Sequence, residues 1–136
     1  MRSRPLDELS SFLRARMDER WRSALEAGPS TGSRVWAADR DRVHDSEGGP
    51  VARVEGGGPA DGRARSHHIC ENDPEHVLRD LESKRRVLEQ YELVRDGLIE
   101  HPEREAILSE YRDVVLPLLA LPFSQHPDYR QKWAPQ

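Results

Sequence analysis

The chain has 136 residues, with 25 acidic and 21 basic side chains and a formal net charge of −4. This length fits one small domain, and a chain of this size can bury about two-thirds of the surface that it exposes when unfolded. Leu, Ile, Val and Phe together make up about a fifth of the chain, close to the composition at which disorder begins. The longest apolar run, residues 114–123, contains two prolines and is too short for a membrane-spanning helix, which needs about 20 residues.

Cysteine content and charge distribution restrict the cellular compartment and the kinds of partner that we expect for this chain. The single cysteine, Cys70, cannot form a disulfide within the chain, which is typical of a reducing cytoplasm. The basic start of the chain has no apolar stretch behind it, so a secretory signal is not expected. Residues 67–136 carry more acidic than basic side chains, and a nucleic-acid interface usually needs a concentrated basic face. We therefore expect a cytoplasmic protein with no membrane partner, and nucleic acid is disfavoured as a partner.

The first predicted element is an amphipathic helix over residues 6–27. Apolar side chains recur there at steps of three and four residues, which places them on one helix face. Pro5 fits the first turn, and Gly28-Pro29 ends the helix. In contrast, residues 28–66 hold eight of the nine glycines and few large apolar side chains, so the core should come mainly from the two flanks.

The middle of the chain predicts a short antiparallel β-meander. Its strands are expected to begin at Val35-Trp36 and to include residues 42–45 and 51–54, with a Gly-Pro turn over residues 46–50. Trp36 is the large side chain expected to anchor this region in the core. Residues 55–66, which include Gly56-Gly57-Gly58, are predicted to be a flexible loop.

Two helices and an irregular tail are predicted for the rest of the chain. Asp73-Pro74 forms a strong helix start, with Asp73 as a cap worth about 1 kcal/mol, and the helix should run to about residue 98. A third helix follows Pro102, with Val114 and Leu118 among its core candidates, and Pro117 should kink or split it. The predicted fold is therefore α+β and one domain over residues 1–136: an N-terminal amphipathic helix, a small antiparallel β-meander, two C-terminal helices and an irregular tail.

A cluster of His67, His68, Cys70 and His76 is the weak candidate for a metal site. Zinc prefers His and Cys ligands, but these spacings match no usual zinc pattern. A fourth ligand would have to come from another histidine elsewhere in the chain. The favoured alternative is that these residues serve the start of the helix, so no metal and no other cofactor is expected.

Catalytic motifs and phosphate-binding motifs are also weak. The sequence contains no recognised phosphate loop, and no nucleophile stands beside an evident base. The basic run Lys84-Arg85-Arg86 could bind phosphate, but Glu82 and Asp80 stand at helical spacing from it. A solvated, salt-bridged helix face is the favoured interpretation, and the same holds for Arg14 with Asp18 in the first helix.

Two stretches carry a resemblance to a known family. The first is the helix start His68-Ile69-Cys70-Glu71-Asn72-Asp73-Pro74, which continues to Arg86. The second is Leu118-Leu119-Ala120-Leu121-Pro122-Phe123, followed by His126-Pro127-Asp128-Tyr129-Arg130 and Trp133. Together they resemble an uncharacterised family of small actinobacterial proteins, a domain of unknown function, across nearly the whole chain. The resemblance implies a Trp-containing strand and a hairpin after the first helix, and it implies no particular activity.

This chain departs from that family at one point. Members often carry a Cys-x-x-Cys cluster before the Leu-Leu-Ala-Leu-Pro segment, where this chain has the charged stretch 101–111. They also tend to have alanine at the position of Cys70. A metal site of the family, if it exists, is therefore lost or substituted in this chain.

These observations favour a non-enzymatic cytoplasmic accessory protein that acts through protein–protein contacts, with an unknown protein or a second copy as partner. Phe123, Tyr129 and Trp133 in the tail are the candidate partner-binding residues. The alternative for these three is that they pack the tail onto the helices. Two other function classes stay open: a nucleic-acid-binding or phage-type regulatory protein that uses the Arg-rich first helix, and a metal-binding protein or enzyme.

Overall fold

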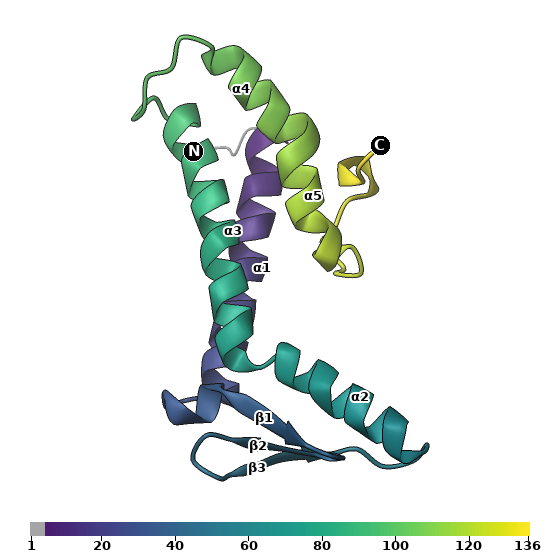
Figure 1. Cartoon of the computed structure of the whole chain (residues 1–136). Coiled ribbons are helices and arrows are strands. Elements are labelled where there is room, and N and C mark those ends of the chain that lie inside the picture. The colour runs from purple at the N-terminus through teal and green to yellow at the C-terminus, as the bar shows by residue number, and fades with distance from the viewer. Residues whose placement is uncertain (1–4) are drawn as a thin grey trace. The chain divides into compact units, whose positions relative to one another are not determined.

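The computed structural model describes residues 5–136, with side chains from residue 8 onward. Within this range the chain forms helices and an antiparallel sheet, which confirms the predicted α+β class (Figure 1). The chain divides into two compact units, one made of Met1–Glu19 and Glu82–Gln136 (unit 1) and one of Arg20–Leu81 (unit 2), and each is described by itself. That the chain is a single domain stays a prediction, because one domain can itself contain more than one compact unit.

The elements follow the predicted order with one addition, the helix α2. The helices are α1 (Pro5–Ala27), α2 (Pro59–Glu71), α3 (Pro74–Arg95), α4 (Arg104–Glu110) and α5 (Leu116–Ala120). The strands are β1 (Trp36–Asp39), β2 (Arg42–Asp45) and β3 (Pro50–Arg53). Short turns complete them: the 3-10 turns η1 (Gly32–Arg34), η3 (Leu121–Phe123) and η4 (Gln131–Trp133), and the π-helical turn η2 (Tyr111–Val115). Among the described helices, none is both long and apolar enough to cross a membrane.

Unit 2 contains the predicted β-meander, in which the three strands pair in chain order and antiparallel. The turn between β1 and β2 places Arg40 in the left-handed region at φ 59°. In the turn before β3, the Asp45 carboxylate accepts the backbone N–H groups of Glu47 and Gly49, as Asx turns do. Trp36 is only half-buried, and the fully buried side chain of the sheet is Val43.

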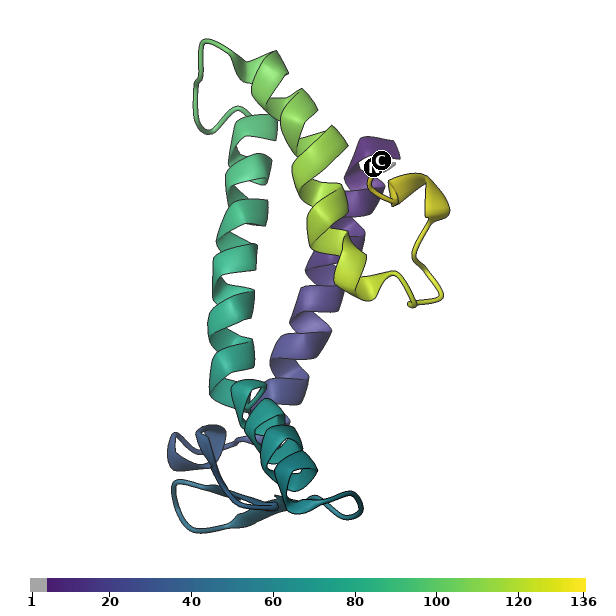
Figure 2. The same cartoon turned by 45° about the vertical axis from the view of Figure 1, so that its right-hand side comes forward.

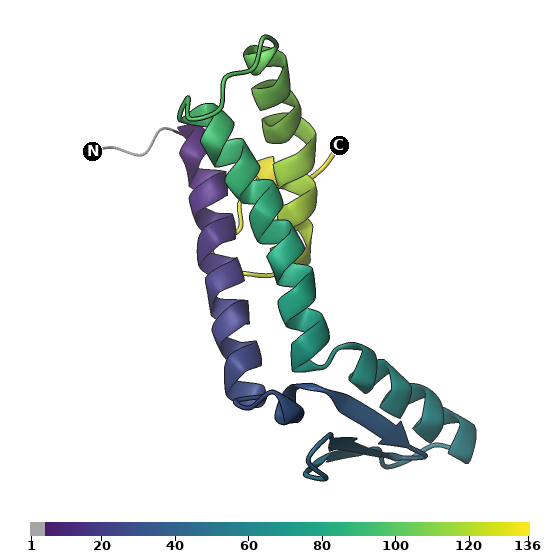
Figure 3. The same cartoon turned by 60° about the vertical axis from the view of Figure 1, so that its left-hand side comes forward.

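The predicted loop over residues 55–66 is wrong from residue 59 onward, because α2 begins there and lies along the sheet (Figure 3). Pro59 fits the first helical turn, and residues 60–65 are mostly good helix formers. The buried face of α2 consists of small side chains, Gly62, Ser66 and Cys70. These residues stand at four-residue spacing, but they give no hydrophobic signal, so a search for Leu or Val periodicity does not find this helix.

The start of α3 is organised by Asp73, whose side chain is only 1% exposed. Its carboxylate accepts the backbone N–H of His76 at 2.8 Å, which is the predicted helix cap. The same carboxylate accepts the backbone N–H of Trp36, at the beginning of β1, at 3.0 Å. The ring Nδ1 of His76 lies 2.7 Å from it as well. One buried charge therefore holds the first strand against the start of α3.

Unit 1 is helical, with the first part of α1, the second part of α3 and the α4–α5 segment lying alongside one another (Figures 1 and 2). Seven of its large buried side chains come from the predicted apolar stripes of these helices, namely Leu9, Leu13, Met17, Leu88, Tyr91, Val94 and Leu108. Phe12, Leu116 and Trp133 are buried as well, and they lie outside those predicted stripes.

Helix α3 ends at Arg95, three residues before the predicted end. Gly97 follows it with φ 75°, a left-handed conformation that favours glycine. The N–H of Gly97 donates to Val94 and the N–H of Leu98 to Leu93, which is the Schellman pattern. The guanidinium of Arg104 also donates to the carbonyls of Val94 and Arg95, so the end of the helix is well capped.

The predicted interruption near Pro117 is confirmed, although it takes the form of a wide turn. Proline lacks an N–H and cannot continue the hydrogen-bond ladder of an α-helix. The chain forms the π-helical turn η2 directly before it, and the N–H of Leu116 donates to Tyr111, five residues back. Pro117 then occupies the first turn of α5. The extra residue in η2 sets which side chains of α5 face the core.

The structure raises the expected contribution of Asp73 above that of a helix cap alone. We expect Asp73→Ala to lower the free energy of unfolding by about 3 kcal/mol, since it removes the cap and leaves the N–H of Trp36 without its acceptor. Urea unfolding followed by circular dichroism measures this loss. Glu89→Ala, at an exposed position of the same helix, is the matched control and should change little. Equal effects of the two substitutions would contradict the assignment.

The pKa of Asp73 also predicts how stability depends on pH. Burial alone raises the pKa of this carboxyl, but its hydrogen bonds from the His76 and Trp36 N–H groups and from the His76 ring outweigh burial and hold the pKa below 3.8, its ordinary value. The carboxylate therefore stabilises the fold above pH 3.8, and this contribution is lost as the pH falls below that value. We expect the unfolding free energy to fall more steeply below about pH 4 in the native protein than in Asp73→Ala. Urea titrations at a series of pH values test this, and parallel profiles would refute it.

Candidate functional site

The three tail residues proposed from the sequence, Phe123, Tyr129 and Trp133, meet around Phe12 of α1. Ring centroids lie 6.4, 6.0 and 5.1 Å from that of Phe12, respectively, and the ring planes are tilted or perpendicular. Trp133 is buried, and Phe123 and Tyr129 are half-buried. This placement matches the alternative in which these residues pack the tail onto the helices. As partner-binding residues they stay a prediction, and little of Trp133 is left exposed for such a role.

Arg16 fastens the same tail segment to α1. Its side chain is 11% exposed, and its guanidinium lies over the ring of Phe12, 5.2 Å from the centroid. Nη1 lies 2.7 Å from Nε2 of His126, and 3.6 Å from the carboxylate of Asp128. The His-Pro-Asp sequence of the tail thus binds the first helix. Sequence spacing gave no sign of this contact, because Arg16 and His126 are 110 positions apart.

An apolar stripe is exposed along the continuous helical segment formed by η2, α5 and η3. Val114, Leu118 and Leu121 are 43%, 52% and 48% exposed, and they recur at steps of four and three residues. The prediction of Val114 and Leu118 as core residues is therefore wrong. The reason is η2, since its extra residue turns the neighbouring Leu116 and Pro117 inward in their place.

A groove runs beside this stripe, between α5 and the end of the tail, with a volume of about 610 Å³. One wall is formed by Val114, Pro117 and Leu118, and the other by residues 133–136, including Trp133. Charged side chains of both signs stand at its rim, namely Arg112, Asp113 and Lys132. We refer to the stripe and this groove together as the α5 surface.

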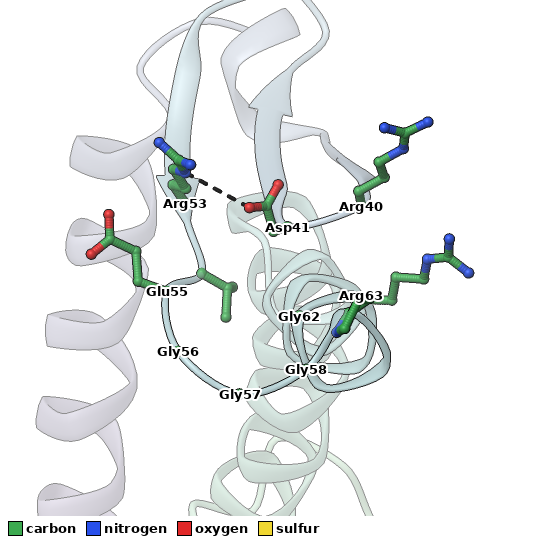
Figure 4. Close-up of a pocket in the computed structure, with 11 residues that line it drawn as sticks. Arg40, Asp41, Arg53, Glu55, Gly56, Gly57, Gly58, Gly62 and Arg63 are labelled. Carbon is green, nitrogen blue, oxygen red and sulfur yellow. Dashed lines mark ion pairs between the residues drawn. The ribbon is translucent and has the colours of Figure 1, made fainter.

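A second hollow lies in unit 2, at the end of the sheet where α2 begins, and has a volume of about 650 Å³ (Figure 4). Gly56, Gly57 and Gly58 form one side, and the first two have positive φ, a conformation that requires glycine here. Three arginines from three different segments complete the lining with several other residues. They are Arg40 of the β1–β2 turn, Arg53 of β3 and Arg63 of α2.

The histidines and the cysteine of the weak metal candidate are not brought together. Cys70 is buried, and this burial is the main cause that raises the pKa of its thiol. The nearby negative charge of Asp73 raises the pKa further, and a raised pKa disfavours the thiolate that metals bind. His67 lies 2.9 Å from Glu71, and His76 is engaged by Asp73. Among the described residues, no group of three or more His, Cys, Asp or Glu side chains is placed to hold a metal ion.

The basic side chains of unit 1 are largely engaged with carboxylates. Arg86 pairs with Glu82 one helical turn away, as predicted. Arg14 instead pairs with Glu92, and Arg85 with Asp18, so these two ion pairs join α1 to α3. The predicted pairing of Arg14 with Asp18 is not the one the structure adopts, because partners on the neighbouring helix come closer.

The packing of the tail onto Phe12 can be tested by truncating that ring. We expect Phe12→Ala to destabilise unit 1 by about 3–5 kcal/mol and to release residues 121–133, because the tail rings share this one partner. Hydrogen exchange of the tail amides should become faster, while Ser11→Ala, at an exposed neighbouring position, should leave it unchanged. Unaltered tail protection in Phe12→Ala would show that other contacts hold the tail.

Comparison with known proteins gives a family but no characterised relative. No curated protein matches the chain. No solved structure matches it either. A family model matches residues 6–135, which is nearly the whole chain, and its description gives a family of unknown function. The chain therefore belongs to the family of unknown function DUF6221.

Proposed function

We propose that this chain is a small, non-enzymatic cytoplasmic protein that acts through protein–protein contacts, and that its α5 surface binds a second copy of the same chain. The observation that carries the proposal is the exposed apolar stripe Val114, Leu118 and Leu121 beside a groove whose lining combines apolar and charged side chains. Side chains of this kind gathered on one helix face are typical of a contact surface. The buried, single Cys70 suits the reducing compartment assumed here.

The shape of the α5 surface favours a second copy as the occupant. The surface presents a ridge, formed by Leu118 and Leu121, directly beside a groove of about 610 Å³. A two-fold axis would bring the ridge of each copy to the groove of the other, so that each contact is made twice. A surface with both features is complementary to itself across a two-fold axis.

The charges at the rim support the same pairing. Asp113 stands on the helix side of the groove and Lys132 on the tail side. In a two-fold arrangement Asp113 of one copy can face Lys132 of the other, and the reverse pair forms as well. The stripe is small compared with a standard interface, so we expect a dissociation constant of roughly 10–100 µM.

Leu118→Asp tests this proposal directly. It places a charge in the centre of the proposed contact, and we expect it to raise the dimer dissociation constant at least about ten-fold. Sedimentation equilibrium over a concentration series measures this change. Leu98→Asp is the matched control, since Leu98 is 74% exposed but lies in the α3–α4 loop, outside the α5 surface. It should leave dimerisation unchanged.

A charge exchange provides a second, more specific readout of the same contact. Asp113→Lys and Lys132→Asp should each weaken the dimer. The double variant should bind more tightly than either single variant, because the opposite charges then face each other again, although Lys132→Asp also removes the contact of Lys132 with Glu8 at 3.9 Å. A native protein that stays monomeric at high concentration would overturn the proposal. Equal effects of Leu118→Asp and Leu98→Asp would also overturn it.

A further inference from the structure

The arginine-lined hollow belongs to unit 2, and the proposed contact of the α5 surface, which belongs to unit 1, uses none of its residues. Its volume of about 650 Å³ lies in the range of small-molecule sites. Its charges are unevenly neutralised. Arg53 lies 3.7 Å from the carboxylate of Asp41, so these two side chains compensate each other. Glu55 also lines the hollow, and Figure 4 shows it on the opposite side from Arg63.

Two positive side chains are then left beside the hollow. Within the described part of the chain, neither Arg40 nor Arg63 has an ion-pair or hydrogen-bond partner, and Figure 4 shows both extending to the same side. They come from separate segments, the β1–β2 turn and α2, so the fold rather than local sequence brings them together. The pair is therefore available to a ligand.

Arg40 is held in a backbone conformation that costs stability. Arg40 adopts a left-handed conformation, which side chains other than glycine rarely take. Local arrangements that disfavour the fold are common at binding sites.

The chemistry of the lining selects the ligand class. Guanidinium groups bind phosphate through planar, paired hydrogen bonds and do so better than other side chains. Among the described residues of the lining, none is a histidine, cysteine, serine or lysine, so the lining favours binding over catalysis. We propose that this hollow binds a phosphate-bearing small molecule, with the phosphate held between Arg40 and Arg63.

The test uses inorganic phosphate and pyrophosphate as probes. Titration of the full chain, followed by ¹H–¹⁵N NMR at constant ionic strength with chloride as the reference anion, should shift the amides of residues 40–42, 56–58 and 60–63. We expect Arg63→Gln to weaken pyrophosphate binding about ten-fold through loss of a charge-assisted pair. Arg65→Gln is the matched control, because Arg65 is exposed on the same helix but does not line the hollow. It should bind as the native protein does.

A second variant blocks the hollow without removing charge. Gly58 has an ordinary φ of −84°, and a Cβ placed there would meet nothing within 4 Å. Gly58→Phe should therefore fold normally, as thermal unfolding would verify, and still lose phosphate binding. If Arg63→Gln and Arg65→Gln weakened pyrophosphate binding equally, the proposal would be overturned, because the anion would then respond to the overall positive charge of the helix and not to the hollow. Retention of binding by a folded Gly58→Phe would overturn it as well, as would binding of a single-stranded oligonucleotide without binding of either phosphate probe.

Discussion

The carboxylate of Asp73 is the charge around which unit 2 is organised. An ionised group that is only 1% exposed is costly unless it receives hydrogen bonds, and it receives them here from two segments that lie far apart in the sequence. The N–H of Trp36 fixes where the first strand begins, and the N–H of His76 fixes where α3 begins. The sheet and α2 are built between these two points. The strand therefore has a defined position even though the region supplies few large apolar side chains.

The parts of the fold that could be predicted from the sequence are those whose signals lie within a few neighbouring residues. The stripe of α1, the Asp73-Pro74 helix start and the Gly-Pro turn before β3 depend on neighbours within a few residues, and each was found where it was expected. Helix α2 was missed because its buried face consists of Gly62, Ser66 and Cys70. Small side chains pack a helix close to a sheet without leaving a hydrophobic pattern. The contact of Arg16 with His126 was missed for another reason, since helical spacing describes only neighbours along one helix.

The candidate surfaces show where residue type alone is a poor guide to role. Aromatic side chains in the tail suggested anchors for a partner, but Phe12 provides an internal partner for all three. The exposed apolar side chains are instead Leu118 and its neighbours, which had the spacing expected of core residues. The assignment of Val114 and Leu118 depended on which side of this helical segment faces inward, and apolar periodicity gives two equivalent answers when a helix is apolar on more than one face.

The wide turn η2 also has a consequence for how related chains are compared. Each residue rotates an α-helix by about 100°, so a chain one residue shorter in this turn would form a regular helix whose final segment is rotated by about that angle. The leucines that reach solvent here would then point elsewhere, although the flanking sequence could be identical. A single deletion at this place would change which face is offered to other molecules without altering any side chain on it. Aligning such a chain to this one position by position would therefore assign it the wrong surface.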